Sequence, residues 1–163
     1  MQIRPLTGDD RTALTGWVTH TAGSPVAVTP LCAYDIRELD GFVAADVDGI
    51  TGVLTCAVER QTCEIVTIDA LQPGRGIGAM LLDSVRKLAV QRGCKRLTLF
   101  TTNDNLQAQR FFERHGFRLA ALYPDAMDAV RQIKPKVPAT GDNGIPLRDM
   151  IRYELKLRRP EIS

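Results

Sequence analysis

The spacing of apolar residues changes once between residues 63 and 93, and the change marks the centre of the chain. The run from Ile65 to Leu71 has the length and composition of a buried β-strand, and it stops at Pro73. Beyond it, apolar residues recur at intervals of three and four, which predicts an amphipathic helix that ends at Gly93. Alternating glycines, Gly74, Gly76 and Gly78, lie between the two patterns. The pattern predicts a strand, a glycine turn and a helix in direct succession.

The strands on either side of this unit follow from the same pattern. Residues 41–47 and 50–58 alternate well enough to be strands, and Asp48-Gly49 between them is a strong hairpin signal. With residues 63–71 they form a predicted antiparallel meander. Residues 96–100 form a further apolar strand beyond the helix. Because a helix connects it to residues 63–71, we expect these two strands to lie parallel.

The rest of the pattern completes a mixed architecture. It predicts strands at residues 3–6, 117–123 and 150–157, helices at 7–18, 105–116 and 125–133, and loops at 21–35 and 135–146. The fold class is therefore α/β (α+β), with a mixed, mostly antiparallel sheet of about seven strands and helices on both faces. A length of 163 residues predicts a single domain over residues 1–163.

The glycine turn has the features of an anion site. A strand, a glycine turn and a helix start together place backbone N–H groups at the positive end of a helix dipole, where a phosphate or diphosphate binds well. Arg75, inside the turn, adds a full positive charge. The alternative is a tight turn whose glycines serve only backbone geometry.

Spacing separates the families that use such a turn. No Lys-Ser or Lys-Thr pair follows the glycines, which excludes a P-loop. Gly74, Gly76 and Ala79 formally satisfy the dinucleotide fingerprint Gly-x-Gly-x-x-Gly/Ala. That fingerprint also requires an acidic residue about 20 positions further on, and the strand at 96–101 carries none. An NAD-binding α/β protein is thus a weaker alternative.

Two segments resemble the GNAT superfamily of acetyl-CoA-dependent N-acetyltransferases. Gly76 and Gly78 match the glycines of its Arg/Gln-x-x-Gly-x-Gly/Ala signature, although Pro73 stands at the Arg/Gln position. Residues 105–117 are similar to the family's Asn-x-x-Ala-x-x-Phe-Tyr-x-x-x-Gly-Phe segment. Together the motifs and the strands between them cover residues 63–123 at the family's spacing.

The resemblance implies a GNAT-like fold and a binding site for acetyl-CoA as co-substrate. In this family the two parallel strands separate beyond a bulge, and the pantetheine arm pairs with backbone groups of the first strand. The residues expected to contact acetyl-CoA are Ile68, Asp69, Ala70, Gly74, Arg75, Gly76, Ile77, Gly78, Ala79, Asn105 and Phe112. Asn105 has a second expected role, as the N-cap of the following helix.

Amine acetylation first requires the loss of a proton. To free a lysine-like ammonium at pH 7 costs roughly 4–5 kcal/mol, so a general base assists greatly. Glu64 resembles the catalytic glutamate of many family members by its strand position, and Asp69 is the alternative base. Simple alternation places them on opposite strand faces, unless a bulge lies between them.

The departing thiolate has no obvious proton donor. The family often places a tyrosine acid where this chain has Phe112, so the resemblance does not supply this role. Water, Tyr123 or Tyr153 are the alternatives. His115 precedes a helix-stopping glycine and is expected at the surface. Cys63 as an acyl-carrying nucleophile lacks an identifiable histidine partner.

Composition restricts the partners. A formal charge of +2 gives no reason to expect nucleic-acid binding, and no apolar run approaches membrane-spanning length. Without a signal-peptide core, the protein is expected to be cytoplasmic. The cysteines have no metal-ligand spacing and are expected to be free thiols, with Cys56, Cys63 and Cys94 in the core.

The sequence thus predicts an N-acetyltransferase in which an amine attacks acetyl-CoA directly in a ternary complex. A non-catalytic acyl-CoA-binding sensor is the alternative that Phe112 raises. The acceptor is a small-molecule or peptide amine whose identity the sequence does not give, and Tyr34 and Asp35 are its candidate contacts. A homodimer stays open as an assembly.

Overall fold

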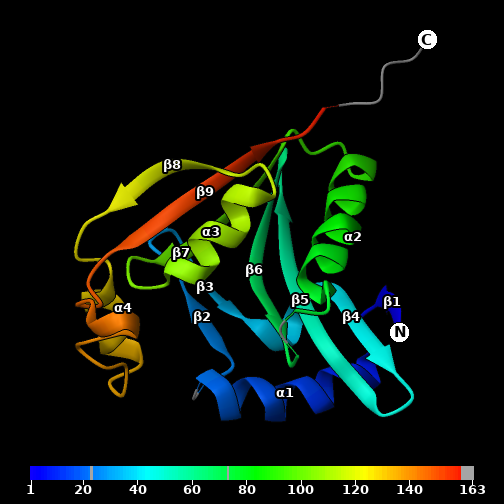
Figure 1. The fold of residues 1–163 in the computed structure, drawn as a ribbon, viewed down its shortest axis with the longest axis horizontal. Coiled ribbons are helices and arrows are strands. Elements are labelled where there is room, and N and C mark those ends of the chain that lie inside the picture. The colour runs from blue at the N-terminus through cyan, green and yellow to red at the C-terminus, as the bar shows by residue number, and fades with distance from the viewer. Residues whose placement is uncertain (23, 73, 159–163) are drawn as a thin grey trace.

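A computed structural model describes residues 1–22, 24–72 and 74–158 and has the predicted mixed architecture (Figure 1). A seven-stranded sheet runs in the order β1-β4-β5-β6-β7-β9-β8, and β2 and β3 form a separate two-stranded sheet. The strands are β1 Gln2–Pro5, β2 Val26–Val28, β3 Ala33–Asp35, β4 Asp40–Asp46, β5 Gly49–Glu59, β6 Thr62–Ala70, β7 Arg96–Thr102, β8 Arg118–Tyr123 and β9 Met150–Lys156. The α-helices are α1 Gly8–Ala22, α2 Ile77–Gln91, α3 Leu106–Arg114 and α4 Met127–Ile133.

The sheet opens in its middle. β6 and β7 pair in parallel, as predicted, but their register runs only from Thr62 with Arg96 to Ile65 with Leu99. Beyond that point β6 stays paired with β5 up to Ala70, whereas β7 stays paired with β9 up to Thr102. The other neighbouring pairs in the described sheet are antiparallel. The dinucleotide-binding alternative, which needs a doubly wound parallel sheet, is therefore wrong.

A bulge in β6 decides which face its acidic residues share. Thr55 of β5 pairs with Thr67 and Cys56 pairs with Ile65, so Val66 is the extra residue. Because one inserted residue reverses the alternation of side chains, Glu64 and Asp69 lie on the same face of the sheet. Simple alternation would have separated them.

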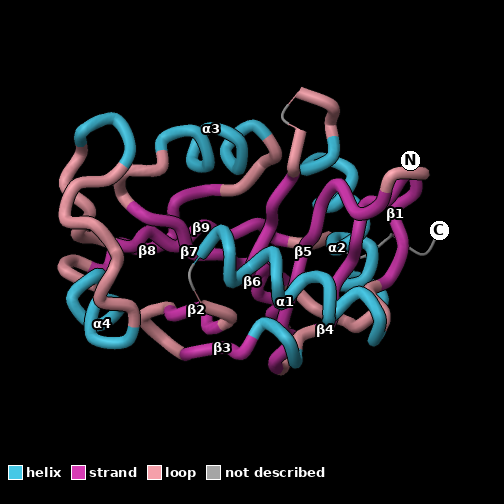
Figure 2. The backbone as a smooth tube through the Cα atoms, turned by 90° about the horizontal axis from the view of Figure 1, so that it is seen from below, coloured by secondary structure: helices cyan, strands magenta, loops and turns pink. Residues whose placement is uncertain are grey.

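Helices cover both faces of the sheet, as predicted (Figure 2). On one face, the main core packs α2 and α3 against the strands through residues such as Leu54, Leu81 and Tyr153. On the other face, Leu14 of α1 packs on Val43 and Val53. A further cluster on that second face joins α4 to Phe100 and Met150, and Val28 of β2 packs against it.

Two predicted segments near the N-terminus need correction. The first helix extends to Ala22 and does not end near Val18. The segment predicted as a loop at 21–35 contains the hairpin of β2 and β3, in which Val26 pairs with Asp35 and Val28 with Ala33. Strands of three residues flanked by Pro25 and Pro30 give too little alternation to be recognised from sequence.

The remaining sequence predictions concern the cysteines and the membrane. Cys56, Cys63 and Cys94 are buried free thiols, as expected, and Cys32 is exposed. Cys63 has no exposed surface, and both its hydrogen bond with Cys56 and its burial raise the pKa of its thiol. It is therefore a poor nucleophile. None of the described helices is long and apolar enough to span a bilayer.

Candidate functional site

The glycine turn leads into a helix whose N-terminus has no side-chain cap. Gly74 and Gly76 adopt positive φ angles of 84° and 72°, which glycine tolerates without strain. Gly76 is the N-cap of α2 and offers no side chain to bond the first N–H groups of the helix, and the first turn holds no acidic residue. The first N–H groups of a helix have no partner within the helix, so they are available to an anion.

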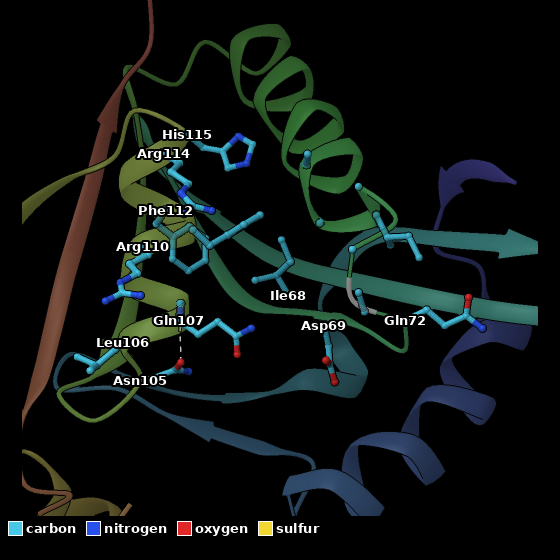
Figure 3. Close-up of a pocket in the computed structure, with 18 of the residues that line it drawn as sticks. Ile68, Asp69, Gln72, Asn105, Leu106, Gln107, Arg110, Phe112, Arg114 and His115 are labelled. Atoms are coloured by element: carbon cyan, nitrogen blue, oxygen red, sulfur yellow. Dashed lines mark hydrogen bonds between the residues drawn. The ribbon is translucent and has the colours of Figure 1, made fainter. Parts of the chain in front are cut away.

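A cleft of about 1350 Å³ runs from this helix start along the open part of β6 to α3 (Figure 3). All of the predicted acetyl-CoA contacts except Arg75 line it: Ile68, Asp69, Ala70, Gly74, Gly76, Ile77, Gly78, Ala79, Asn105 and Phe112. Open space surrounds the Cα atoms of Gly74 and Gly76, with no atom within 4 Å of an added Cβ. The bare helix start and this open space fit a diphosphate with an extended arm.

Arg75 does not line the cleft. Its side chain is exposed, and its Nη1 donates a hydrogen bond to Oε1 of Gln72 at 2.7 Å. Gln72 itself lines the cleft, although the family signature places its polar residue one position later. That later position, Pro73, lies outside the described residues.

Gly78 serves packing between helices. A Cβ at this position would lie 3.0 Å from Cζ and 3.4 Å from Cε2 of Phe111. The Phe111 ring also packs edge-on against Phe112, at 5.2 Å between centroids. The absence of a side chain at Gly78 lets α3 approach the first turn of α2 and sets the width of the cleft.

The sequence did not identify the basic wall of the cleft. Arg110, Arg114 and His115 line it from α3 and its C-terminal end (Figure 3). His115 was expected at the surface, but it is half-buried and its ring lies 4.6 Å from that of Phe111. The four-residue spacing of Arg110 and Arg114, which places them on one helix face, was the available signal.

Asn105 and Phe112 have structural roles in α3. The Asn105 side chain accepts a hydrogen bond from the Ala108 backbone N–H at 3.0 Å and caps the helix, as expected. Phe112 is buried between Phe111 and Phe117 and brings no hydroxyl to the cleft.

Neither tyrosine suggested as a substitute acid lines the cleft. The Tyr153 hydroxyl donates to Oε1 of Glu113 at 3.0 Å, and burial together with that contact raises the pKa of Tyr153 to about 12. Tyr123 packs against Phe100 on the other face of the sheet. The hypothesis that one of them donates a proton to the thiolate therefore gains no support.

Glu64 lies where the parallel strands begin to separate. It pairs with Thr98 of β7, one residue before the end of the parallel register, and it faces away from α2. Only 9% of its surface is exposed, and its Oε2 is buried without a hydrogen-bond partner in the part of the chain that the structure describes. Burial raises the pKa of Glu64, while Tyr34 and Arg152 act in the opposite direction.

Asp69 shares this face but differs in its surroundings. It is exposed and lines the cleft near the end of β6, on the side away from α2 (Figure 3). Partial desolvation raises the pKa of its carboxyl, against a hydrogen bond from the Ala70 backbone. Both carboxylates are therefore near the opening, with Glu64 deeper in the sheet.

The two candidate acceptor contacts also differ. The Tyr34 hydroxyl lies beside Glu64, and burial together with this negative neighbour raises the pKa of Tyr34. The Asp35 carboxylate instead accepts a hydrogen bond from the Arg37 backbone N–H at 3.1 Å and forms an ion pair with the Arg37 side chain at 2.7 Å. Its carboxylate is thus used in capping a short 3-10 helix at Ile36–Glu38.

Comparisons with known proteins agree with this geometry. Residues 12–117 match the model of the acetyltransferase (GNAT) family. The Bacillus subtilis (strain 168) protein named Uncharacterized protein YdhI is 36% identical over 141 residues, which cover 86% of this chain and 88% of that one.

Solved structures share the fold. An IAA acetyltransferase from Bacillus cereus ATCC 14579 superposes with a TM-score of 0.71 at 22% identity, over 96% of this chain and 99% of that one. A GNAT family acetyltransferase from Elizabethkingia anophelis, solved with acetyl-CoA bound, gives 0.71 at 20% identity, over 96% and 97%. Together with the family model and the relative above 30% identity, the open sheet and its glycine turn identify the chain as a member of the GNAT family of acetyltransferases.

Proposed function

We propose that the protein acetylates an amine with acetyl-CoA by direct attack in a ternary complex, and that Glu64 is the general base. The observation that carries the proposal is a buried carboxylate with a free oxygen at the point where β6 and β7 separate. The cleft is lined by Ile68, Asp69 and Ala70 of β6, which follow the bulge, and Glu64 lies four residues before Ile68 on the same strand, outside that lining.

Binding of acetyl-CoA would use backbone more than side chains. The N–H groups at the start of α2 suit the diphosphate, and the bare β6 edge at Ile68, Asp69 and Ala70 suits the pantetheine arm. Arg110 and Arg114 add positive charge along α3. The thioester would then lie near the closed end of the opening, in reach of an amine on the Glu64 side.

The reaction has a simple balance. Glu64 removes a proton from the ammonium, and the amine nitrogen forms a bond to the thioester carbonyl carbon. The carbon–sulfur bond breaks, the sulfur leaves as a thiolate, and the second proton of the attacking nitrogen passes to that thiolate or to water. With a thiol pKa of about 8.5, departure as a thiolate costs roughly 2 kcal/mol at pH 7, so the reaction tolerates the absence of a hydroxyl at Phe112.

The decisive experiment compares Glu64→Gln with Asp69→Asn. We expect Glu64→Gln to lower kcat at neutral pH by about 100-fold or more, the size of a general-base contribution, with the affinity for CoA unchanged. Asp69→Asn is the matched control, because it removes a carboxylate on the same face. Acetylated amine is measured by chromatography, and CoA affinity by calorimetry.

The outcomes separate the hypotheses. Full turnover in Glu64→Gln with loss in Asp69→Asn would move the base to Asp69. CoA binding without turnover of any amine by the wild-type protein would favour the acyl-CoA sensor that Phe112 suggests.

A further inference from the structure

The sheet face that carries Glu64 also carries Arg152, whose buried Nε has no hydrogen-bond partner among the described residues. Register places Glu64 opposite Thr98 on β7, and two residues along that strand Phe100 lies opposite Arg152 of β9. Residues opposite each other in a ladder share a face, as do residues two apart on one strand. Glu64, Thr98, Phe100 and Arg152 therefore form one surface on the face turned away from α2, together with Glu154, which lies opposite Thr98 and pairs with Arg96 at 3.8 Å.

This surface holds both of the buried side-chain atoms that lack a hydrogen bond among the described residues. They are Oε2 of Glu64, an acceptor, and Nε of Arg152, a donor. Native proteins rarely leave such atoms unsatisfied, and each one requires an explanation. A ligand that presents one donor and one acceptor would satisfy both.

The two groups do not satisfy each other. The Arg152 charge reaches Glu64 and lowers the pKa of its carboxyl, yet the described residues include no ion pair between them. Two strand spacings and two residues separate their backbones, about 10 Å across and about 7 Å along the sheet. Both side chains extend from the same face, so a small molecule on that face can contact both charged ends.

The β2–β3 hairpin covers the same surface. Tyr34 of β3 lies beside Glu64, and Val28 of β2 packs against the cluster that contains Phe100. Figure 2 shows the hairpin and α1 on the side of the sheet opposite α3. A covered surface with a carboxylate and a guanidinium favours a compact acceptor over an extended polypeptide.

We propose that the acceptor is a small amino acid-like molecule, whose ammonium meets Glu64 and whose carboxylate meets Arg152. The inference rests on the proposed acetyltransferase function and adds the substrate class. It assigns Arg152 to acceptor binding, a role distinct from the chemistry at Glu64. A lysine side chain or a peptide N-terminus has no free carboxylate beside its amine and would leave Arg152 unpaired.

The test pairs each acceptor with its uncharged counterpart. The purified protein is supplied with acetyl-CoA and with the standard amino acids, β-alanine and 4-aminobutyrate, each alongside its carboxamide. A lysine peptide with blocked ends is included. For at least one class of acceptor (α-, β- or γ-amino acid), we expect kcat/KM for the carboxylate to exceed that for the matching carboxamide by about 10- to 100-fold. This ratio corresponds to the free energy of a hydrogen bond to a charged group.

Arg152→Gln tests the assignment of the residue. In this variant the preference for carboxylate over carboxamide should fall to near one, through KM more than kcat, because binding is lost and the base is retained. Arg118→Gln, at an exposed position on the neighbouring strand β8, is the control and should keep the preference. Thermal unfolding and CoA affinity of both variants show whether the fold and the acetyl-CoA site are intact.

Each result decides one point. Equal rates for carboxylates and carboxamides, or a preference that survives Arg152→Gln, would overturn this inference and leave the acetyltransferase proposal in place. Exclusive turnover of the blocked lysine peptide would do the same. If no amine reacts although CoA binds, the proposed function fails and this inference fails with it. Should Arg152→Gln not fold, Arg152→Met, which keeps an unbranched apolar stem and removes the guanidinium, replaces it with the same expected loss of preference.

Discussion

At the scale of the residue, Glu64 combines two features that seldom occur together in a folded protein. It is an ionisable side chain in the interior of a sheet, and one of its oxygens has no hydrogen-bond partner. Burial disfavours the charged form, so the pKa of Glu64 lies above the ordinary glutamate range. Tyr34 and Arg152 favour the charged form, whereas Glu59 opposes it.

A pH profile follows from that direction. The proposed base, Glu64, acts when ionised, so kcat/KM should fall as the pH falls through the raised pKa of Glu64. We expect an acidic limb with its midpoint above the ordinary glutamate value. Glu64→Gln should remove this limb, and Asp69→Asn should keep it. A limb that is identical in Glu64→Gln would assign the titration to another group.

Burial of Glu64 also affects the stability of the fold. A salt bridge stabilises the folded state when its carboxylate is ionised, whereas ionisation of buried Glu64 destabilises it. A group whose pKa is raised in the folded state loses its favourable contribution as the pH rises through that pKa. Above it, ionised Glu64 is a cost to folding. The thermal midpoint of Glu64→Gln should therefore equal or exceed that of the wild type at neutral pH, so a loss of turnover cannot be attributed to unfolding.

At the scale of the element, α1 is fixed to the edge of the sheet by a buried carboxylate. Asp10 accepts hydrogen bonds from Arg4 of β1 at 2.6 and 2.9 Å and from the Thr7 backbone N–H at 2.8 Å. The Arg4 contact, with the Thr7 hydrogen bonds, holds the pKa of Asp10 well below its usual range.

Asp10→Asn should lower the free energy of unfolding by about 1.5–3 kcal/mol at neutral pH, the value of a hydrogen bond to a charged group. Because the pKa is depressed, this contribution is present above the pKa of an unfolded aspartate and is lost as the pH falls through the folded value. Urea unfolding at neutral pH measures the difference. Asp9→Asn, in the same first turn but exposed, is the control and should cost much less. An equal loss of unfolding free energy in both variants would mean that Asp10 acts only through its charge near the helix dipole and not through its hydrogen bonds.

The contact of α2 with α3 gives a second prediction at this scale. In Gly78→Ala the new methyl group would press on the Phe111 ring, which lines the cleft. We expect the affinity for CoA to fall by no more than about tenfold, because the Phe111 ring must move by only a few tenths of an ångström and the family signature accepts alanine at this position. Gly16→Ala, also within a helix but with nothing within 4 Å of the added carbon, should leave it unchanged. Unaltered CoA affinity in Gly78→Ala would mean that the ring moves freely.

The pattern of apolar residues and glycines in the sequence predicted most of the helices and strands. β4, β5, β6 and β9 are apolar-rich runs of seven to eleven residues, and Gly76 and Gly93 mark helix ends with positive φ. The β2–β3 hairpin was missed because its strands are short and pair only with each other. The bulge at Val66 leaves no sequence signal, since it exists only in the pairing with β5.

At the scale of the whole molecule, the acetyl-CoA side of the site was predictable and the acceptor side was not. Most of the cleft is built from two segments, residues 68–79 without the undescribed Pro73 and residues 105–115, whose motifs can be recognised in the chain, although the basic residues Arg110, Arg114 and His115 were not identified from them. The surface around Glu64 joins β6, β7 and β9 of the large sheet with β3 of the separate hairpin, so Arg152 approaches it through the strand order and Tyr34 through the packing of the hairpin on the sheet. Chain positions about 90 and 30 residues away carry no local signal of that approach.

The early end of the parallel register has a consequence for the protein before it meets its co-substrate. Where β6 and β7 separate, each strand gains an edge inside the sheet. The edge of β6 presents unpaired backbone N–H and C=O groups to the cleft and not to bulk solvent. An exposed edge of this kind would form β-sheet hydrogen bonds with any extended chain that could reach it. Its position within a cleft walled by α2 and α3 admits a narrow, flexible arm and shields it from the strands of neighbouring molecules.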